Sequence, residues 1–277
     1  MPLTVCRFIR KMRGGAQSHL LETTDGGFYI VKFQNNPQHR RILVNELISA
    51  ELLRYLQIST PQPALIEISE EFLRQNPDVC ITLGSQRLVI QPGWHFGSRH
   101  PGHPERTPVY DFIPDSLLVE VSNLADYLGV AVFDKWAGNA DGRQCIFFRA
   151  QVRSWDPSHR AKPLKTGFVT AMIDHGFVFQ GPNWSFHDSP IQGLYPRKVV
   201  YSKVTSLDSF QPWLDQVVHF PEEVIDRACK QIPPKWIDGE EEELERVLEK
   251  LLERRKTLPE LLIQVRNARP EVFPNWK

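Results

Sequence analysis

The sequence lacks the features that mark several classes of protein. It has no run of about 18 apolar residues, the length that a membrane-spanning helix needs. Its N-terminal stretch is too highly charged for a signal peptide. The four cysteines lie far apart and form no CxxC pair, which argues against a zinc cage or a disulfide framework; they are Cys6, Cys80, Cys145 and Cys229. We therefore expect a cytoplasmic protein without a membrane segment.

An excess of one charge is also absent. Lys and Arg together number 33, as do Asp and Glu. No bulk charge therefore attracts nucleic acid or an anionic membrane, and direct nucleic-acid binding is disfavoured. Hydrophobic residues make up 41% of the chain and charged residues 24%, which is typical of a globular protein with a sizeable core.

The hydrophobic pattern changes along the chain. Residues 4–33 are expected to form a strand, a glycine loop, a strand, a turn and a strand. An apolar stripe predicts a helix over 39–58. Two further strands are expected at 64–69 and 86–91. Together these elements predict a small β-rich lobe that ends near Phe96.

The rest of the chain is expected to be mainly helical. Residues 93–114 are rich in Gly, Pro and His, and we expect a connector there. Periodic runs predict helix over 115–138 and an amphipathic helix over 239–255. Two strands, 145–150 and the first part of 168–179, are expected to form a hairpin around a polar loop near Pro157, Pro163 and Gly167. The overall prediction is an α+β fold with two parts, residues 1–96 and 97–277.

A short loop of small residues follows the first predicted strand. Without Cβ atoms in the way, its backbone N–H groups can approach phosphate oxygens. The loop comprises Gly14, Gly15, Ala16, Gln17 and Ser18, and the last two add side-chain donors. A plain hairpin turn explains the same pattern, so this loop alone does not establish a phosphate site.

A lysine and a glutamate form the second candidate feature. Lys32 lies within the β-prone stretch YIVKF, and Glu46 lies on the predicted helix 39–58. A helix packed on the sheet would turn Glu46 toward Lys32, holding the ammonium group where it can meet phosphates. The simpler alternatives are an edge-strand lysine and an exposed helix charge.

Two aspartates form the third feature. Asp141 lies in a polar loop that leads into one strand of the predicted hairpin, and Asp174 ends the other strand. The ends of the two strands meet if the hairpin forms, which brings both carboxylates to one place. One carboxylate can then orient a hydroxyl nucleophile while the other binds Mg²⁺. Taken singly, each aspartate is also a common turn residue.

The order of these motifs resembles the HipA-like kinases of the protein-kinase-like superfamily. GGAQSHL resembles the family's phosphate loop, GNAD its catalytic loop and IDHGF its metal-binding element. The resemblance implies two lobes with ATP between them and a hinge near 94–97, so that His95 and Phe96 contact the nucleotide. It makes Asp141 the catalytic aspartate and Asp174 the Mg²⁺ ligand. Lys32 would hold the α- and β-phosphates, with Glu46 as its ion-pair partner.

The sequence departs from the family pattern at the second metal ligand. The family has asparagine five residues after the catalytic aspartate, where this chain has Ile146. Gln144 or Asn139 could replace it. Many members of the family have a basic residue two positions after the G-A-Q motif. This chain has His19 at that position. Nucleotide binding is therefore better supported by the sequence than catalysis.

Two function hypotheses follow from the sequence. The first is an ATP- and Mg²⁺-dependent kinase that phosphorylates a hydroxyl, with Ser or Thr of a protein as the acceptor. The second is an ATP-binding pseudokinase that acts as a regulatory module, within a toxin–antitoxin type of complex; Ile146 favours it. A zinc site at the three histidines of 95–103 is disfavoured, because their spacing is irregular and no acidic or cysteine ligand is near.

Overall fold

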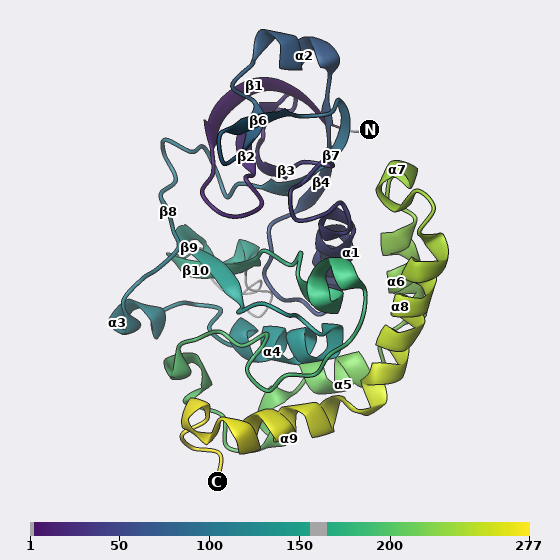
Figure 1. The fold of residues 1–277 in the computed structure, drawn as a ribbon. Helices are drawn as coiled ribbons and strands as arrows, with labels where there is room; N and C mark the ends of the chain where they lie inside the picture. The colour runs from purple at the N-terminus through teal and green to yellow at the C-terminus, as the bar shows by residue number, and fades with distance from the viewer. Residues whose placement is uncertain (1–2, 156–164) are drawn as a thin grey trace.

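The computed structural model describes residues 3–155 and 165–277. Its N-terminal part is a closed five-stranded barrel, seen at the top of Figure 1. Four of the strand pairs are antiparallel, and a parallel pair between the first and fourth strands closes the barrel. In barrel order the strands are β1 (Leu3–Lys11), β2 (His19–Thr23), β3 (Phe28–Lys32), β7 (Gly93–Arg99) and β4 (Pro63–Ile68).

A short excursion joins β4 to β7. It contains α2 (Glu70–Gln75) and a two-stranded sheet of β5 (Cys80–Leu83) and β6 (Gln86–Val89). The helix begins where the Ser69 hydroxyl accepts a hydrogen bond from the Phe72 N–H at 3.1 Å, a standard N-cap. Apolar residues of this excursion, Phe72, Val79, Ile81 and Ile90, are buried in the core of the barrel.

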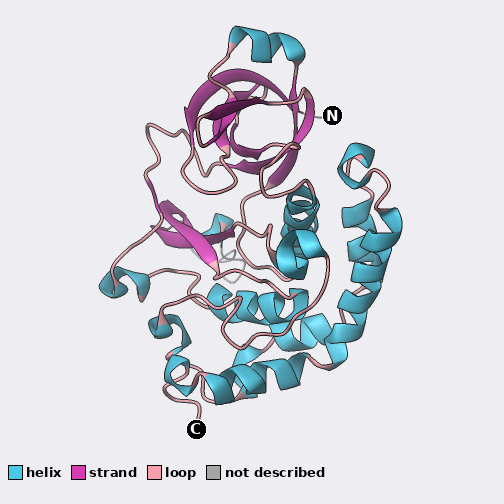
Figure 2. Ribbon diagram, viewed as in Figure 1, coloured by secondary structure: helices cyan, strands magenta, loops and turns pink. Residues whose placement is uncertain are grey.

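The remaining elements are mostly helices, cyan in Figure 2, around a small sheet. The sheet has the order β10-β9-β8, with strands β8 (Val109–Tyr110), β9 (Gln144–Gln151) and β10 (Thr166–Ile173). The α-helices are α1 (Arg41–Tyr55), α3 (Asp115–Leu118), α4 (Asp126–Ala137), α5 (Trp213–Val218), α6 (Glu222–Cys229), α7 (Pro234–Ile237), α8 (Glu241–Glu253) and α9 (Leu258–Ala268). Short 3₁₀ turns, η1 (Val152–Ser154), η3 (Val178–Asn183), η4 (Lys198–Tyr201), η5 (Leu207–Phe210), η6 (Arg254–Lys256) and η7 (Pro270–Val272), complete the chain. No helix in the described part of the chain could cross a membrane.

The described residues form three hydrophobic cores, and the two larger ones do not follow the order of the elements in the sequence. The barrel has its own core, which includes Tyr29, Phe33 and Ile66. A larger core unites the helices with the sheet, and the buried residues of α1 belong to this second core. Helix α1 therefore packs with the helical part although it lies between β3 and β4 in sequence. It also contacts strands β4 and β7 of the barrel.

The predicted mixture of strands and helices is confirmed. The strands at β1, β2, β3, β4 and β6, the helix α1, the amphipathic α8 and the β9–β10 hairpin all form. Pro157 and Pro163 of the predicted loop lie outside the described residues, and Gly167 lies within β10.

Two expectations were wrong. Residues 93–99 are not a connector but strand β7, which pairs with both β3 and β4. The proposed hinge at 94–97 therefore lies inside a strand. The helix expected over 115–138 is also interrupted, because only α3 and α4 are helical and the residues between them run beside β10.

Candidate active site

A buried lysine lies where the barrel meets the helical part. Lys32, the last residue of β3, forms ion pairs with Glu46 of α1 and with Asp174, which follows β10. Its Nζ lies 2.5 Å from Asp174 Oδ1. The Lys32 side chain is 10% exposed and that of Glu46 only 3%, whereas Asp174 keeps 33%. The two carboxylates raise the pKa of Lys32 against the effect of burial, so the lysine is charged.

The segment Asp174-His175-Gly176 also contacts Glu46. Glu46 Oε1 accepts a hydrogen bond from the Gly176 N–H at 3.0 Å. A Cβ on Gly176 would lie 2.5 Å from Ile42 of α1, so only glycine allows this approach. Burial would raise the pKa of Asp174, but the positive charge of Lys32 outweighs it and lowers that pKa. The predicted Lys32–Glu46 pair therefore exists, and Asp174 joins it.

The β9–β10 hairpin brings the second aspartate to the same end of the sheet. Gln144 of β9 pairs with Ile173 of β10. Asp141 lies three residues before Gln144, and Asp174 directly follows Ile173. The Asp141 carboxylate is exposed and accepts hydrogen bonds from the Gly142 N–H at 2.7 Å and from Gln144 Nε2 at 3.3 Å. The site thus presents an oriented, exposed carboxylate at the end of the hairpin where Asp174 contacts Lys32.

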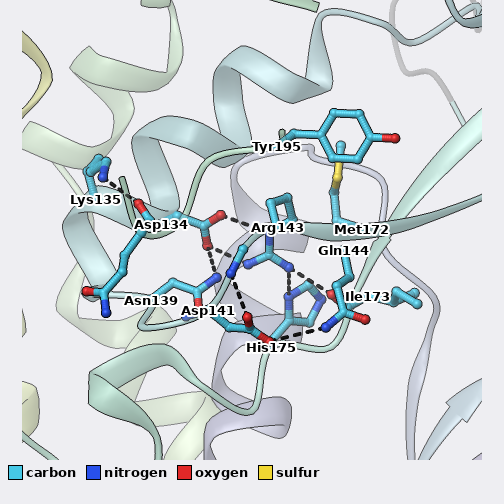
Figure 3. Close-up of polar contacts among 12 residues, drawn as sticks. Asp134, Lys135, Asn139, Asp141, Arg143, Gln144, Met172, Ile173, His175 and Tyr195 are labelled. Carbon is cyan, nitrogen blue, oxygen red and sulfur yellow. Dashed lines mark hydrogen bonds and ion pairs between the residues drawn. The ribbon is translucent and has the colours of Figure 1, made fainter. Parts of the chain in front are cut away.

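An arginine that the sequence analysis did not single out connects the two aspartate loops (Figure 3). Arg143 is fully buried and forms an ion pair with Asp134 of α4. Its NH1 donates to the carbonyl oxygen of Ile173 and to His175 Nδ1, at 2.8 and 2.9 Å. Burial, with the nearby charges of Arg143 and Lys32, lowers the pKa of His175 far below 6.5. His175 is therefore neutral, and its Nε2–H donates to Thr60 Oγ1 at 3.1 Å.

The predicted glycine loop lies at the same end of the barrel as Lys32. His19, the first residue of β2, pairs with Val31, next to Lys32, so residues 12–18 turn beside the end of β3. Gly14 has φ +120°, a conformation that favours glycine. The Gln17 side chain bonds to the backbone N–H and carbonyl of Thr82 in β5. Its amide thus fastens the loop to the β5–β6 hairpin.

The other predicted site residues have different positions. Phe96 lies opposite Lys32 in the β3–β7 register. Phe96 is buried in the larger core, and His95 is fully buried in the barrel, where its ring packs edge-on against Phe33 at 5.5 Å. Asn139 is also buried, with its Nδ2 donating to Asp134 and its Oδ1 accepting from the Asp141 N–H. Both ends of that amide are used within the loop, so Gln144 is the better placed of the two candidate metal ligands.

The donor set of the site fits a hard divalent cation. Lys32, Glu46 and Asp174 together carry a net charge of −1, and Asp141 adds another negative charge. Carboxylate and amide oxygens are the ligands that Mg²⁺ prefers, usually completed by water and substrate phosphates. Within residues 3–155 and 165–277, no cluster of three His, Cys, Asp or Glu side chains could hold a metal ion. Oxygens of a bound phosphate would therefore have to complete the coordination.

A lysine–glutamate pair, an exposed aspartate and a second aspartate after a strand are parts that phosphoryl-transfer enzymes use. A family model described as HipA-like kinase matches residues 5–146, more than half of the chain. The chain therefore belongs to the HipA-like kinase family. The resemblance expected from the motifs is confirmed.

Comparison with solved structures gives a more distant likeness. A crystal structure of the Golgi casein kinase aligns with a TM-score of 0.48 at 11% sequence identity, covering 97% of this chain and 74% of that one. A second structure of the Golgi casein kinase, with Mn/ADP bound, aligns with a TM-score of 0.48 at 10% identity, covering 97% and 73%. No curated protein matches the chain.

Proposed function

We propose that the protein is an ATP- and Mg²⁺-dependent kinase that transfers the γ-phosphoryl group to a hydroxyl, with Ser or Thr of a protein as the acceptor. The observation that carries the proposal is the contact of Lys32 with both Glu46 and Asp174, beside the exposed Asp141. The parts that phosphoryl transfer requires are a lysine for the phosphates, a carboxylate for the metal and a carboxylate for the hydroxyl.

The reaction uses these groups in distinct roles. The acceptor oxygen attacks the γ-phosphorus, its bond to phosphorus forms, and the bond to the β–γ bridging oxygen breaks, leaving ADP. Asp141 orients the hydroxyl and takes its proton. Lys32 leaves Asp174 to hold phosphate oxygens while Glu46 keeps its ammonium in place. Asp174, with Gln144, would hold Mg²⁺, which supplies neutralisation of the phosphate charge. Most of the catalysis is then positioning and electrostatic stabilisation.

We further propose that ATP binds between two lobes, residues 1–96 and 97–277. The glycine loop at 14–18 would cover the phosphates, because it turns beside the end of β3 that carries Lys32. Since 94–97 forms part of β7, the connection between the lobes would follow that strand. Helix α1 would contact both lobes, because it carries Glu46 and packs in the larger core.

The pseudokinase hypothesis retains one specific observation. Ile146 occupies the position where the family has asparagine, and it packs against the apolar cluster of Phe148 and Ala171. It offers no metal ligand. The protein can act as a kinase only if Gln144 or a substrate oxygen takes that coordination position. Gln144→Leu should therefore raise the Mg²⁺ concentration needed for half-maximal turnover in a kinase, and should leave ATP binding by a pseudokinase unchanged.

The test is turnover of γ-labelled ATP by the whole protein with Mg²⁺. We expect Asp141→Asn and Asp174→Asn to reduce transfer by about 10²-fold or more, because each removes a group used in the transition state. Asp215→Asn is the matched control, since this exposed aspartate lies far along the chain in α5. ATP binding without transfer, and indifferent to Mg²⁺, would support the pseudokinase. No ATP binding would contradict both hypotheses.

A further inference from the structure

Asn45 occupies a completely buried position on α1, next to Glu46. Its side-chain amide contacts four points on the segment that follows Asp174. Nδ2 lies 2.7 Å from the carbonyl oxygen of Gly176 and 3.0 Å from those of Val178 and Gly181, and Oδ1 accepts from Trp184 Nε1 at 2.8 Å. One side chain therefore fastens residues 176–184 to the helix that carries Glu46.

Gly176 is held on both sides of its backbone. Its N–H donates to Glu46 Oε1 at 3.0 Å, and its carbonyl accepts from Asn45. Asp174 lies two residues earlier and itself has φ +59°, in the left-handed region. The position of Asp174 thus depends on where the segment behind it is anchored.

The anchored segment is strained. Phe179, Gln180 and Trp184 have φ values of +55°, +57° and +48°, which non-glycine residues rarely adopt. Such conformations persist only where the surroundings determine them more strongly than the local preference. Arg41 adds a second contact, with its guanidinium 4.3 Å from the centre of the Trp184 ring and a hydrogen bond of 2.8 Å to the Pro182 carbonyl.

We propose that Asn45 is a positioning residue. By fixing 176–184 to α1, it keeps Glu46 and Asp174 at the places where both meet Lys32. The site is then assembled before nucleotide binds, and no modification of the segment after Asp174 is needed to bring α1 inward. This inference rests on the proposed function, because the positions matter only if Lys32 and Asp174 serve phosphoryl transfer.

The test compares Asn45→Leu with a matched variant on the same helix. Leu has nearly the shape of Asn but neither donates nor accepts. Ser49→Ala is the control, because Ser49 lies one turn further along α1, is completely buried, and has no hydrogen-bond partner for its Oγ among the described residues. Hydrogen–deuterium exchange of the whole protein measures the clamp without any turnover. Steady-state kinetics with Mg²⁺ and ATP measure its consequence.

In Asn45→Leu we expect exchange across 174–184 to rise at least about tenfold, while the barrel strands and α8 exchange as in the wild type. We expect kcat to fall by about 10²-fold, the effect of misplacing catalytic groups by about 1 Å. KM for ATP should change much less, because Lys32 and the glycine loop remain. Ser49→Ala should match the wild type in both measurements.

The outcomes distinguish a failure of the positioning role of Asn45 from a failure of the proposed kinase function. Unchanged exchange across 174–184, or raised exchange with wild-type kcat, would overturn the positioning role. If Asn45→Leu does not fold, Trp184→Phe replaces it: this variant removes the indole N–H to Asn45 but keeps an aromatic ring at the position that Arg41 contacts, and should show the same local pattern at a smaller size. A wild-type protein that transfers no phosphoryl group would overturn the proposed kinase function alone, since the exchange measurement still judges the clamp.

Discussion

Two groups of buried charges lie close together in this molecule, and they differ in what they leave open. Lys32 meets two carboxylates, so its group has a net charge of −1, and Asp174 remains 33% exposed. Arg143 meets one carboxylate, Asp134, and both side chains are completely buried. The first group, Lys32 with Glu46 and Asp174, keeps a net charge and an exposed carboxylate that a ligand can contact, and we call it the open group. The second, Arg143 with Asp134, has no net charge and no exposed side chain, and we call it the closed group.

This difference separates the residues that hold the fold together from the residues that take part in the proposed reaction. The balanced Asp134–Arg143 pair ties α4 to the carbonyl of Ile173 and to His175, so it fixes the loops on which both aspartates lie. The unbalanced group contains the residues that meet phosphates and metal in the proposed reaction. Substitutions in the closed group should therefore mainly lower the free energy of unfolding. Substitutions in the open group should mainly change how the protein responds to a ligand such as Mg²⁺.

The largest effect is expected from Arg143→Met. The variant leaves the Asp134 carboxylate buried without its cation, which should lower the free energy of unfolding by about 3–5 kcal/mol. Urea denaturation measures this loss. The double variant Asp134→Leu with Arg143→Met should recover part of it, because no lone charge remains. A cost below about 1 kcal/mol for the single variant would refute the assignment of this pair to the architecture.

A smaller loss of stability is expected from Lys32→Met. We expect about 2 kcal/mol, because Asp174 reaches water and only Glu46 is left buried without its partner. Phosphoryl transfer should be lost. Mg²⁺ alone should raise the Tm of this variant more than that of the wild type, since the lysine no longer competes for Asp174. Thermal denaturation with and without Mg²⁺ checks this.

The variant Arg143→Met serves as the control for the metal response. Its open group is unchanged in composition, so Mg²⁺ should raise its Tm no more than it raises that of the wild type. An equal response of both variants to Mg²⁺ would show that the two groups do not divide the work as proposed.

The open group was predictable from the sequence because its members sit in local motifs. Lys32 lies in a β-prone stretch, Glu46 on an apolar helix stripe, and Asp174 directly after a buried strand. Each motif fixes an element, and the elements bring the residues together. Asn45 and Arg143 carry no such signal. Their partners include backbone carbonyls and a histidine that lie 30 or more residues away in sequence, and these come close only once the chain has folded.

The errors in the fold have similar causes. Strand β7 has the sequence GWHFGSR, which reads as a connector because of its glycines. A Cβ on Gly97 would lie 2.4 Å from Ile66 Cγ1, so the closing of the barrel requires glycine inside this strand. The apolar run before α4 is not helical because Asn123 bonds to both backbone groups of Thr170 in β10. Tertiary contacts outweigh the local periodicity at both places.

The smallest effect concerns a buried histidine of the barrel that belongs to neither charged group. His19 is completely buried between the rings of Phe8 and Phe33, and its ring nitrogens have no partner among the described residues. Burial, aided by the charge of Lys11, lowers the pKa of His19 from 6.5 to about 4. Below pH 6.5 His19 therefore binds a proton in the unfolded chain but stays neutral in the folded chain. The free energy of unfolding consequently decreases as the pH is lowered.

Between pH 6.5 and 5.5 this one histidine should cost about 1 kcal/mol of stability, and the loss should continue until the pH reaches about 4. His19→Phe should remove that part of the slope, because phenylalanine takes up no proton. His219→Ala is the control for the loss of a histidine, since the His219 side chain lies outside the barrel and is 72% exposed. Urea denaturation over this pH range measures all three proteins. A slope unaltered by His19→Phe would mean that His19 takes up its proton in the folded protein, so that the barrel opens to water at this residue.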